Sequence, residues 1–188
     1  MISNPFLTIG YESPEYFCDR REETQELIRL LTNGNNIALI SPRRIGKTGL
    51  VYHCFAQPQM QDYYTFLVDI YATKSLTEFV FEFGKTIMST LKSREQRLID
   101  RFVGIVKSLR TGISFDQFGN PSWNIELGEI QTPSVTLDEI FEYLESADKQ
   151  CVVAIDEFQS INNYPDNNIE ALLRTYVQRC KNTHFIFS

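Results

Sequence analysis

One octapeptide of the chain has the residue types and the spacing of a phosphate-binding loop. The sequence Ser41-Pro-Arg-Arg-Ile-Gly-Lys-Thr48 fits the pattern G-x-x-x-x-G-K-[ST], except that Ser41 replaces the first glycine. Gly46 would let the backbone turn so that successive N–H groups face a β-phosphate, and Lys47 would extend along the β- and γ-phosphates. The hydroxyl of Thr48 would bind Mg²⁺. Because a small serine fits wherever φ is negative, we expect Ser41 to weaken the motif match more than the binding itself.

Two adjacent acids could complete this chemistry. The segment Cys151-Val-Val-Ala-Ile155 is typical of a strand buried on both faces, and Asp156 and Glu157 follow it directly. Asp156 would hold the magnesium shell through water, and Glu157 would polarise the attacking water as a general base. Alone, the two acids are more typical of a helix cap or an exposed loop. Together with the phosphate loop, they favour nucleotide hydrolysis.

Strands and helices alternate around these two motifs. Compact apolar runs predict strands over residues 36–40, 63–70, 151–155 and 184–188, the first of them buried on both faces. Apolar residues at helical spacing predict helices over residues 20–32, 76–91, 98–109 and 168–179, with two more that begin at the phosphate loop and at residue 136. This alternation predicts a mainly parallel sheet. With the phosphate loop, we expect a P-loop NTPase fold with three layers, α/β/α.

Local signals add detail to this arrangement. The segments Asp19–Glu22 and Thr136–Glu139 resemble capping boxes, which predict that helices begin there, and Gly34 is a natural left-handed helix end. Between Thr111 and Pro133 the period of the apolar residues changes to two around a turn rich in glycine, asparagine and proline. We therefore expect an inserted β-hairpin whose two strands contain Ile113 and Phe115, then Trp123, Ile125 and Leu127.

Composition and charge exclude several classes of protein. The 188 residues fit one domain spanning residues 1–188, and 43% hydrophobic with 22% charged residues argues against disorder, collagen and coiled coil. The net charge of −6 argues against a protein held to nucleic acid mainly by phosphate neutralisation. The apolar runs are far shorter than the roughly 20 residues that span a bilayer. Because the amino terminus also lacks the pattern of a secretory signal, we expect a cytoplasmic protein without a membrane role.

The remaining reactive and basic residues do not form a recognisable site. Four separated cysteines and two histidines exclude a zinc site and a disulfide framework, and His53 beside Cys54 is better explained by packing than by thiol catalysis. Arg94, Arg97 and Arg101 share one face of a predicted helix within a basic stretch. We interpret this face as a solvated surface or a partner contact, because acids lie in the same helix and no aromatic stacking pattern accompanies it.

The two motifs, preceded by Phe17-Cys-Asp-Arg-Arg-Glu22, resemble the archaeal-type ATPase family, which belongs to the STAND branch of P-loop ATPases and is related to AAA+ proteins. The resemblance covers nearly the whole chain. It implies that residues 17–22 lie near the adenine end of the nucleotide, although Cys18-Asp19 replaces the usual small residue. It also implies that Ser188 is a sensor residue at the tip of the fourth strand. Arg174 lies where related ATPases often carry an arginine that faces a neighbouring subunit; the alternative is a surface ion pair.

Proteins of this family continue past the sensor strand into a fifth strand and a helical lid. The resemblance therefore implies that the chain is incomplete at its carboxyl end. Since the family's fifth strand lies beside the first, we expect the backbone of residues 36–40 to form an unpaired edge of the sheet.

The sequence thus leads us to expect an ATP-binding domain with Mg²⁺-dependent ATP hydrolysis. Glu157, Lys47 and Ser188 are the predicted catalytic residues, and Thr48 and Asp156 the predicted magnesium ligands. The predicted nucleotide-binding residues are Ser41, Pro42, Arg43, Arg44, Ile45, Gly46, Lys47, Thr48 and Gly49. The alternatives are a nucleotide-dependent switch with little turnover, an accessory protein for nucleic-acid or mobile-element processes, and a purely structural P-loop fold. A protein partner or self-association stays open, and we do not expect this domain alone to bind nucleic acid.

Overall fold

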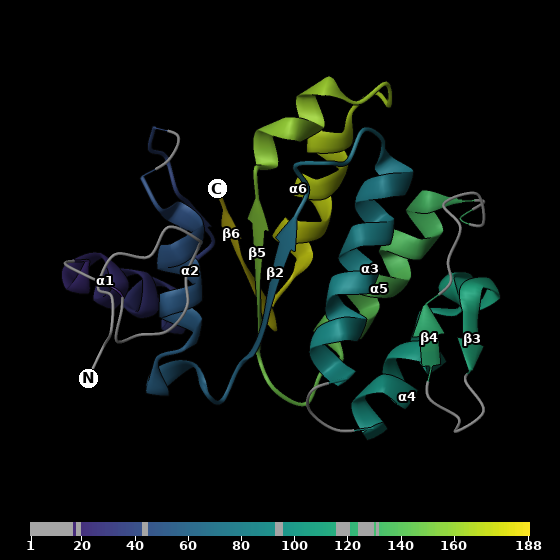
Figure 1. Ribbon diagram of the computed structural model, residues 1–188, viewed down its shortest axis with the longest axis horizontal. Helices are drawn as coiled ribbons and strands as arrows, with labels where there is room; N and C mark the ends of the chain where they lie inside the picture. Colours follow the sequence, from purple (N-terminus) through teal and green to yellow (C-terminus); the bar gives the residue numbers. More distant parts are fainter. Residues whose placement is uncertain are drawn as a thin grey trace, which may run out of the picture.

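A parallel sheet of four strands forms the centre of the domain. The computed structural model describes residues 17, 20–42, 45–92, 96–115, 121–123, 130 and 132–188. The strand order is β1-β6-β5-β2, and each neighbouring pair is parallel. The strands are β1 (Ile37–Ala38), β2 (Tyr64–Asp69), β5 (Cys151–Asp156) and β6 (Thr183–Phe187). The carboxyl ends of β2, β5 and β6 all point to the same end of the molecule, the top in Figure 1.

Helices cover both faces of this sheet. On one side lie α1 (Arg21–Thr32) and α2 (Lys47–Phe55). On the other side lie α3 (Leu76–Lys92), α5 (Pro133–Glu145) and α6 (Ile169–Arg179), with α4 (Gln96–Ile105) packed against α3 and α5 (Figure 1). Short 3₁₀ helices are η2 (Pro58–Met60), η3 (Lys107–Gly112) and η5 (Phe158–Asn163). The predicted three-layer α/β/α fold with a parallel sheet is confirmed.

The strand β5 divides its side chains between the two layers. All six of its residues are buried. Val152 and Ala154 pack with residues of α1 and α2, whereas Val153 and Ile155 belong to the larger core on the other face. Because side chains alternate along a strand, Asp156 continues the series that faces α2. The fold therefore directs the Asp156 carboxylate toward the helix that begins at the phosphate loop.

The first strand differs from the prediction. Residues 36–40 were expected to form a strand buried on both faces, but β1 has only two residues, of which Ala38 is exposed, and Ile40 is 94% exposed. The reason is its position, because within the described part of the chain β1 pairs only with β6 and lies at the edge of the sheet. One further bond, from the N–H of Leu39 to the carbonyl of Phe187 at 2.8 Å, extends the pairing toward the phosphate loop.

Helix ends follow some predicted signals and not others. Gly34 has the predicted left-handed conformation, with φ +79°. The segment Thr136–Glu139 does not begin a helix, because α5 starts a turn earlier at Pro133, a residue favoured in the first helical turn. Thr136 is instead fully buried and accepts a hydrogen bond from the Ser108 hydroxyl, and Glu139 accepts one from the Ser108 N–H. The first helix has Arg20 at its N-cap, and Asp19 lies outside the described residues.

The predicted hairpin is present and follows η3 in the chain. Strand β3 (Ile113–Phe115) pairs antiparallel with β4 (Pro121–Trp123), so Ile113 is opposite Trp123, and Ile125 and Leu127 lie outside the described residues. The predicted helix over residues 98–109 is divided, because α4 ends at Ile105 and η3 begins two residues later. Among the described residues, no helix has the length and apolar character needed to cross a membrane.

Candidate active site

The phosphate loop joins the end of β1 to the first turn of α2. Gly46 is the N-cap of α2 and has φ +77°, a left-handed conformation that L side chains rarely adopt. The position therefore favours glycine. Ser41 meets the condition set by the sequence, because only Glu157 and Asn168 among the described non-glycine residues have positive φ. Arg43 and Arg44, both predicted to bind nucleotide, lie outside the described residues.

The ammonium of Lys47 lies at the loop itself. Its Nζ donates to the carbonyl of Ser41 at 3.2 Å and to that of Pro42 at 3.5 Å. In addition, the hydroxyl oxygen of Ser41 is buried and has no hydrogen-bond partner among the described residues. A buried polar atom without a partner is uncommon in folded proteins. The loop thus brings together a side-chain cation and an unsatisfied hydroxyl, as a binding site for an oxyanion would.

Asp156 joins three segments that are distant in sequence. Its Oδ2 accepts a hydrogen bond from the Thr48 hydroxyl at 2.5 Å, and its Oδ1 accepts one from the Ser188 hydroxyl, also at 2.5 Å. The N–H of Glu157 donates to Oδ1 at 3.1 Å. Asp156 is only 8% exposed. The predicted site residues Thr48, Asp156 and Ser188 are therefore in direct contact.

Glu157 has a left-handed backbone conformation at the end of β5. It follows β5, forms the N-cap of η5 and has φ +56°, a conformation that costs roughly 1–2 kcal/mol for a residue with a side chain. The amide of Gln159 donates to Glu157 Oε2. The side chain of Gln159 was present in the sequence motif but was given no role there. The structure makes it the partner that orients the Glu157 carboxylate.

Arg20 is a second residue that the sequence did not single out. Its Nη1 donates to the carbonyls of Ile45 and Gly46, each at 3.2 Å, while its Nε is 2.5 Å from the carboxylate of Glu23. The start of α1 is thus attached to the phosphate loop. Its position in the segment that resembles the family motif was the available signal, but the sequence did not reveal which carbonyls it would reach.

Phe17, His53 and Cys54 pack around the first turns of α2. The rings of Phe17 and His53 stack with centroids 4.1 Å apart, and Phe17 also lies against Gly49. Cys54 is fully buried, and burial raises the pKa of its thiol to about 12. A thiol with so high a pKa is a poor nucleophile at neutral pH. The packing interpretation of the His53 and Cys54 pair is confirmed.

The donor set suits magnesium better than a transition metal. Thr48, Asp156 and Ser188 offer only oxygen atoms, which Mg²⁺ prefers. Within the described residues, no group of three or more histidine, cysteine, aspartate or glutamate side chains could enclose a metal ion. Magnesium ions in nucleotide sites keep several waters and are held by one or two carboxylates together with phosphate oxygens. The residues therefore fit an ion that arrives with a nucleotide.

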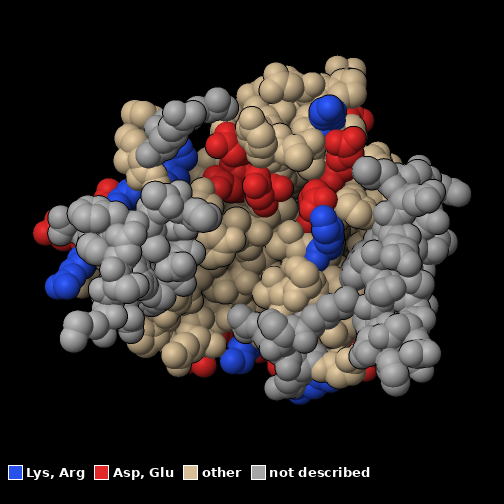
Figure 2. Space-filling view, viewed as in Figure 1, with Lys and Arg blue, Asp and Glu red and all other residues tan. Residues whose placement is uncertain are grey.

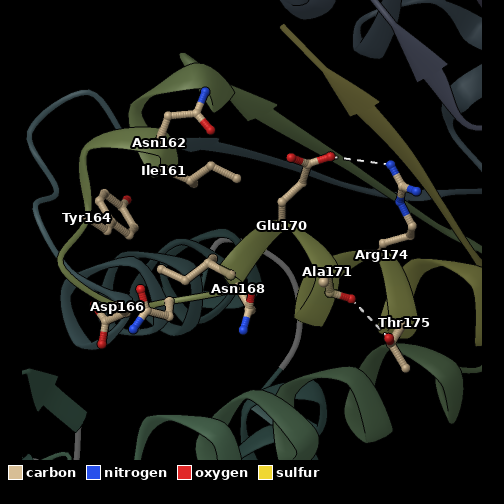
Figure 3. Close-up of a pocket in the computed structure, with 11 residues that line it drawn as sticks. Ile161, Asn162, Tyr164, Asp166, Asn168, Glu170, Ala171, Arg174 and Thr175 are labelled. Carbon is tan, nitrogen blue, oxygen red and sulfur yellow. Dashed lines mark hydrogen bonds and ion pairs between the residues drawn. The ribbon is translucent and has the colours of Figure 1, made fainter.

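Two of the hollows in the described part of the structure are lined in part by residues that the sequence singled out. One of about 250 Å³ borders the phosphate loop between α1 and β1 and is lined by Arg20, Leu27, Leu39, Ser41 and Lys47, among others. A larger one of about 700 Å³ lies between η5 and the start of α6 (Figure 3). At its side, Arg174 pairs with Glu170 at 3.3 Å, and both side chains are about two-thirds exposed. Arg174 thus has the surface ion pair that was the alternative to a subunit contact.

The basic face of α4 contacts the domain's own surface. Arg97 pairs with Asp148 at 3.3 Å, and Arg101 donates to the carbonyl of Ser146. Both partners belong to the turn between α5 and β5. Arg94, the third arginine of the predicted face, lies outside the described residues.

Comparison with known proteins gives a fold. The chain is similar to the Walker-type ATPase PABY2304 of Pyrococcus abyssi, with a TM-score of 0.57 and 20% identity over 98% of this chain and 48% of the other. It is also similar to the Aeropyrum pernix ORC2 protein, with a TM-score of 0.50 and 18% identity over 97% of this chain and 43% of the other. The chain has a P-loop ATPase fold.

The similarity stops at the fold, because identities of 18–20% do not establish a shared activity. The chain spans less than half the length of either solved structure. A scan against models of known families gives no match, and neither does a search of curated proteins.

Proposed function

We propose that this chain is an ATP-binding domain that hydrolyses ATP with the help of Mg²⁺. The proposal rests on the contact of Thr48 and Ser188 with the two oxygens of Asp156. Thr48 directly follows Lys47, the lysine of the phosphate loop. A purely structural P-loop fold would not need two hydroxyls to donate to one buried carboxylate beside the phosphate loop.

Each residue has a separate part in the proposed reaction. The backbone N–H groups of residues 46–49 and the ammonium of Lys47 bind the β- and γ-phosphates, aided by the amino terminus of α2. Thr48 and Asp156 hold the ion, directly and through water. Bound Mg²⁺ neutralises negative charge on the phosphate oxygens. Ser188 fixes the direction of the Asp156 carboxylate through the bond at 2.5 Å.

Glu157 is the proposed general base. It removes a proton from a water whose oxygen forms a bond to the γ-phosphorus, while the bond from that phosphorus to the bridging β-oxygen breaks and yields ADP and phosphate. Gln159 holds Glu157 Oε2. The resemblance to archaeal-type ATPases of the STAND branch supports the same assignment. The similarity to a structure described as ADPNP–ADP complexes supports nucleotide binding.

The decisive experiment separates binding from turnover. Lys47→Ala should abolish ATP binding in calorimetry, because it removes the main side-chain charge on the phosphates. Glu157→Gln should keep the ATP affinity and lower turnover by roughly 100-fold or more. The matched controls are Lys85→Ala and Glu82→Gln, which remove the members of an ion pair on α3 at 3.0 Å. Equal ATP affinity in wild type and Lys47→Ala would refute the phosphate-loop assignment.

A nucleotide-dependent switch with little turnover is the second candidate. The bond from Gln159 to Glu157 favours it, because the amide uses a lone pair with which Oε2 could accept a proton from water. Retention of ADP with negligible phosphate release would support the switch. Fast phosphate release that Glu157→Gln abolishes would exclude it.

A further inference from the structure

Asp69 is the last residue of β2 and the direct neighbour of Asp156. The two residues are register partners in the parallel pair of β2 and β5. Neighbouring strands lie about 4.8 Å apart, so the two backbones are as close as a sheet allows. Figure 2 shows acidic side chains gathered at this end of the sheet, above the middle of the molecule.

The side chains of Asp69 and Asp156 point to the same face of the sheet. Two residues before Asp69, Leu67 packs against the core that contains α1 and α2, and so do Val152 and Ala154 of β5. Phe66 and Val68, the alternate residues of β2, belong to the core on the opposite face. Asp69 therefore faces the layer of α2, the helix that begins with Lys47 and Thr48.

The hydrogen bonds of the two acids differ. Both oxygens of Asp156 are occupied, by the hydroxyls of Thr48 and Ser188 and by the N–H of Glu157. Asp69 is exposed, and its Oδ1 accepts the N–H of Tyr71 at 2.9 Å. Within the part of the chain that the structure describes, its Oδ2 has no donor. The turn at Tyr71 thus uses Oδ1 of Asp69 as an acceptor, whereas Oδ2 accepts no hydrogen bond from the described residues.

We propose that Asp69 is a positioning residue of the magnesium site, where its free oxygen accepts a hydrogen bond from a water bound to the ion. The inference rests on the proposed function. Magnesium ions keep several waters, and each of these waters needs hydrogen-bond acceptors. A carboxylate has about four lone-pair sites, and three of those on Asp156 already accept hydrogen bonds, so a second carboxylate beside it would supply acceptors that Asp156 lacks. Residues that hydrogen-bond the ligands of a metal, and not the metal itself, typically change metal affinity by about 10–100-fold when they are removed.

The test compares metal dependence with nucleotide affinity. In Asp69→Asn, the Mg²⁺ concentration that gives half-maximal ATP binding should rise by about tenfold. The affinity for ATP in EDTA should stay equal or become tighter, because one negative charge near the phosphates is lost. Both are measured by calorimetry on the full chain. Asparagine keeps an oxygen for the N–H of Tyr71, so the turn is preserved.

Asp62→Asn is the matched control, since it makes the same change of charge at the other end of β2, where the side chain is 98% exposed. If Asp69→Asn melts at a lower temperature than wild type, Asp69→Ser repeats the test, because a serine hydroxyl also accepts the N–H of Tyr71.

Each outcome decides the proposal. A shift in metal dependence with Asp69→Asn but not with Asp62→Asn supports it. ATP binding with the same metal dependence in wild type, Asp69→Asn and Asp62→Asn overturns it and leaves the proposed function standing. A wild-type chain that binds no ATP in either buffer overturns both. Equal loss of affinity with and without Mg²⁺ in Asp69→Asn shows a structural role and also overturns it.

Discussion

Replacing Arg20 by alanine should weaken ATP binding while the domain stays folded. In the native structure the guanidinium joins the N-cap of α1 to the carbonyls of Ile45 and Gly46. These carbonyls precede Lys47, so their orientation determines where the following N–H groups point. In the native protein, the contact with Arg20 already restricts the loop before ATP binds. Without Arg20, the loop loses this conformational freedom only when ATP binds, and that loss weakens the affinity.

The size of the effect follows from the two bonds. A hydrogen bond from a charged donor contributes about 1.5–3 kcal/mol, but both bonds are long at 3.2 Å and the arginine side chain is 22% exposed. We therefore expect about 1–2 kcal/mol for the pair together. At 1.4 kcal/mol for each factor of ten, the Kd for ATP should rise by roughly 5–30-fold.

Arg29→Ala is the control for this change. Arg29 lies on the same helix and forms a similar ion pair, with Glu26 at 2.6 Å, but it has no hydrogen bond to the described residues of the loop. Calorimetric titration with ATP and Mg²⁺ gives the Kd of both variants, and urea unfolding gives their stability. If Arg20→Ala and Arg29→Ala bind ATP equally well, the loop is ordered without Arg20 and the reasoning is wrong.

Two further predictions concern stability. Asn182→Ala should lower the free energy of unfolding by about 1–3 kcal/mol in urea titrations, because its amide donates to the carbonyls of Leu144, Ala147 and Lys149 at 3.2–3.3 Å; an unchanged midpoint would contradict this. Burial lowers the pKa of His184 below its ordinary 6.5, against an opposing effect of Glu145, so the unfolded state binds more protons and stability should fall as pH drops through 6.5. Unfolding of wild type and His184→Asn between pH 7.5 and 5 checks this. The difference in their free energies of unfolding should change with pH if His184 is responsible and stay constant if it is not.

The sequence was most informative where a residue type has one physical use. A left-handed backbone conformation costs glycine least, and Gly46 has that conformation at the N-cap of α2. An apolar run that ends in two acids predicted a buried parallel strand, and β5 is buried throughout. These signals are local, because the strand or turn that they specify lies within a few neighbouring residues.

Features that depend on distant contacts were missed. The segment Thr136–Glu139 has the pattern of a capping box, but the side chains of Thr136 and Glu139 accept hydrogen bonds from Ser108 in η3. The exposure of β1 depends on its place in the strand order. Likewise, the partners of Arg20 and the register of Asp69 with Asp156 are set by packing between segments, which no spacing within one segment encodes.

The contacts of Asp156 also bear on the kinetics of folding. Thr48 is 108 positions from Asp156, and Ser188 is 32 positions from it. The site therefore forms only after the chain has closed its long-range parallel pairing, which is the slow part of folding for such topologies. A nucleotide that binds this site would have little to bind in the transition state. It should slow unfolding and raise the melting temperature with concentration, yet leave the rate of folding almost unchanged.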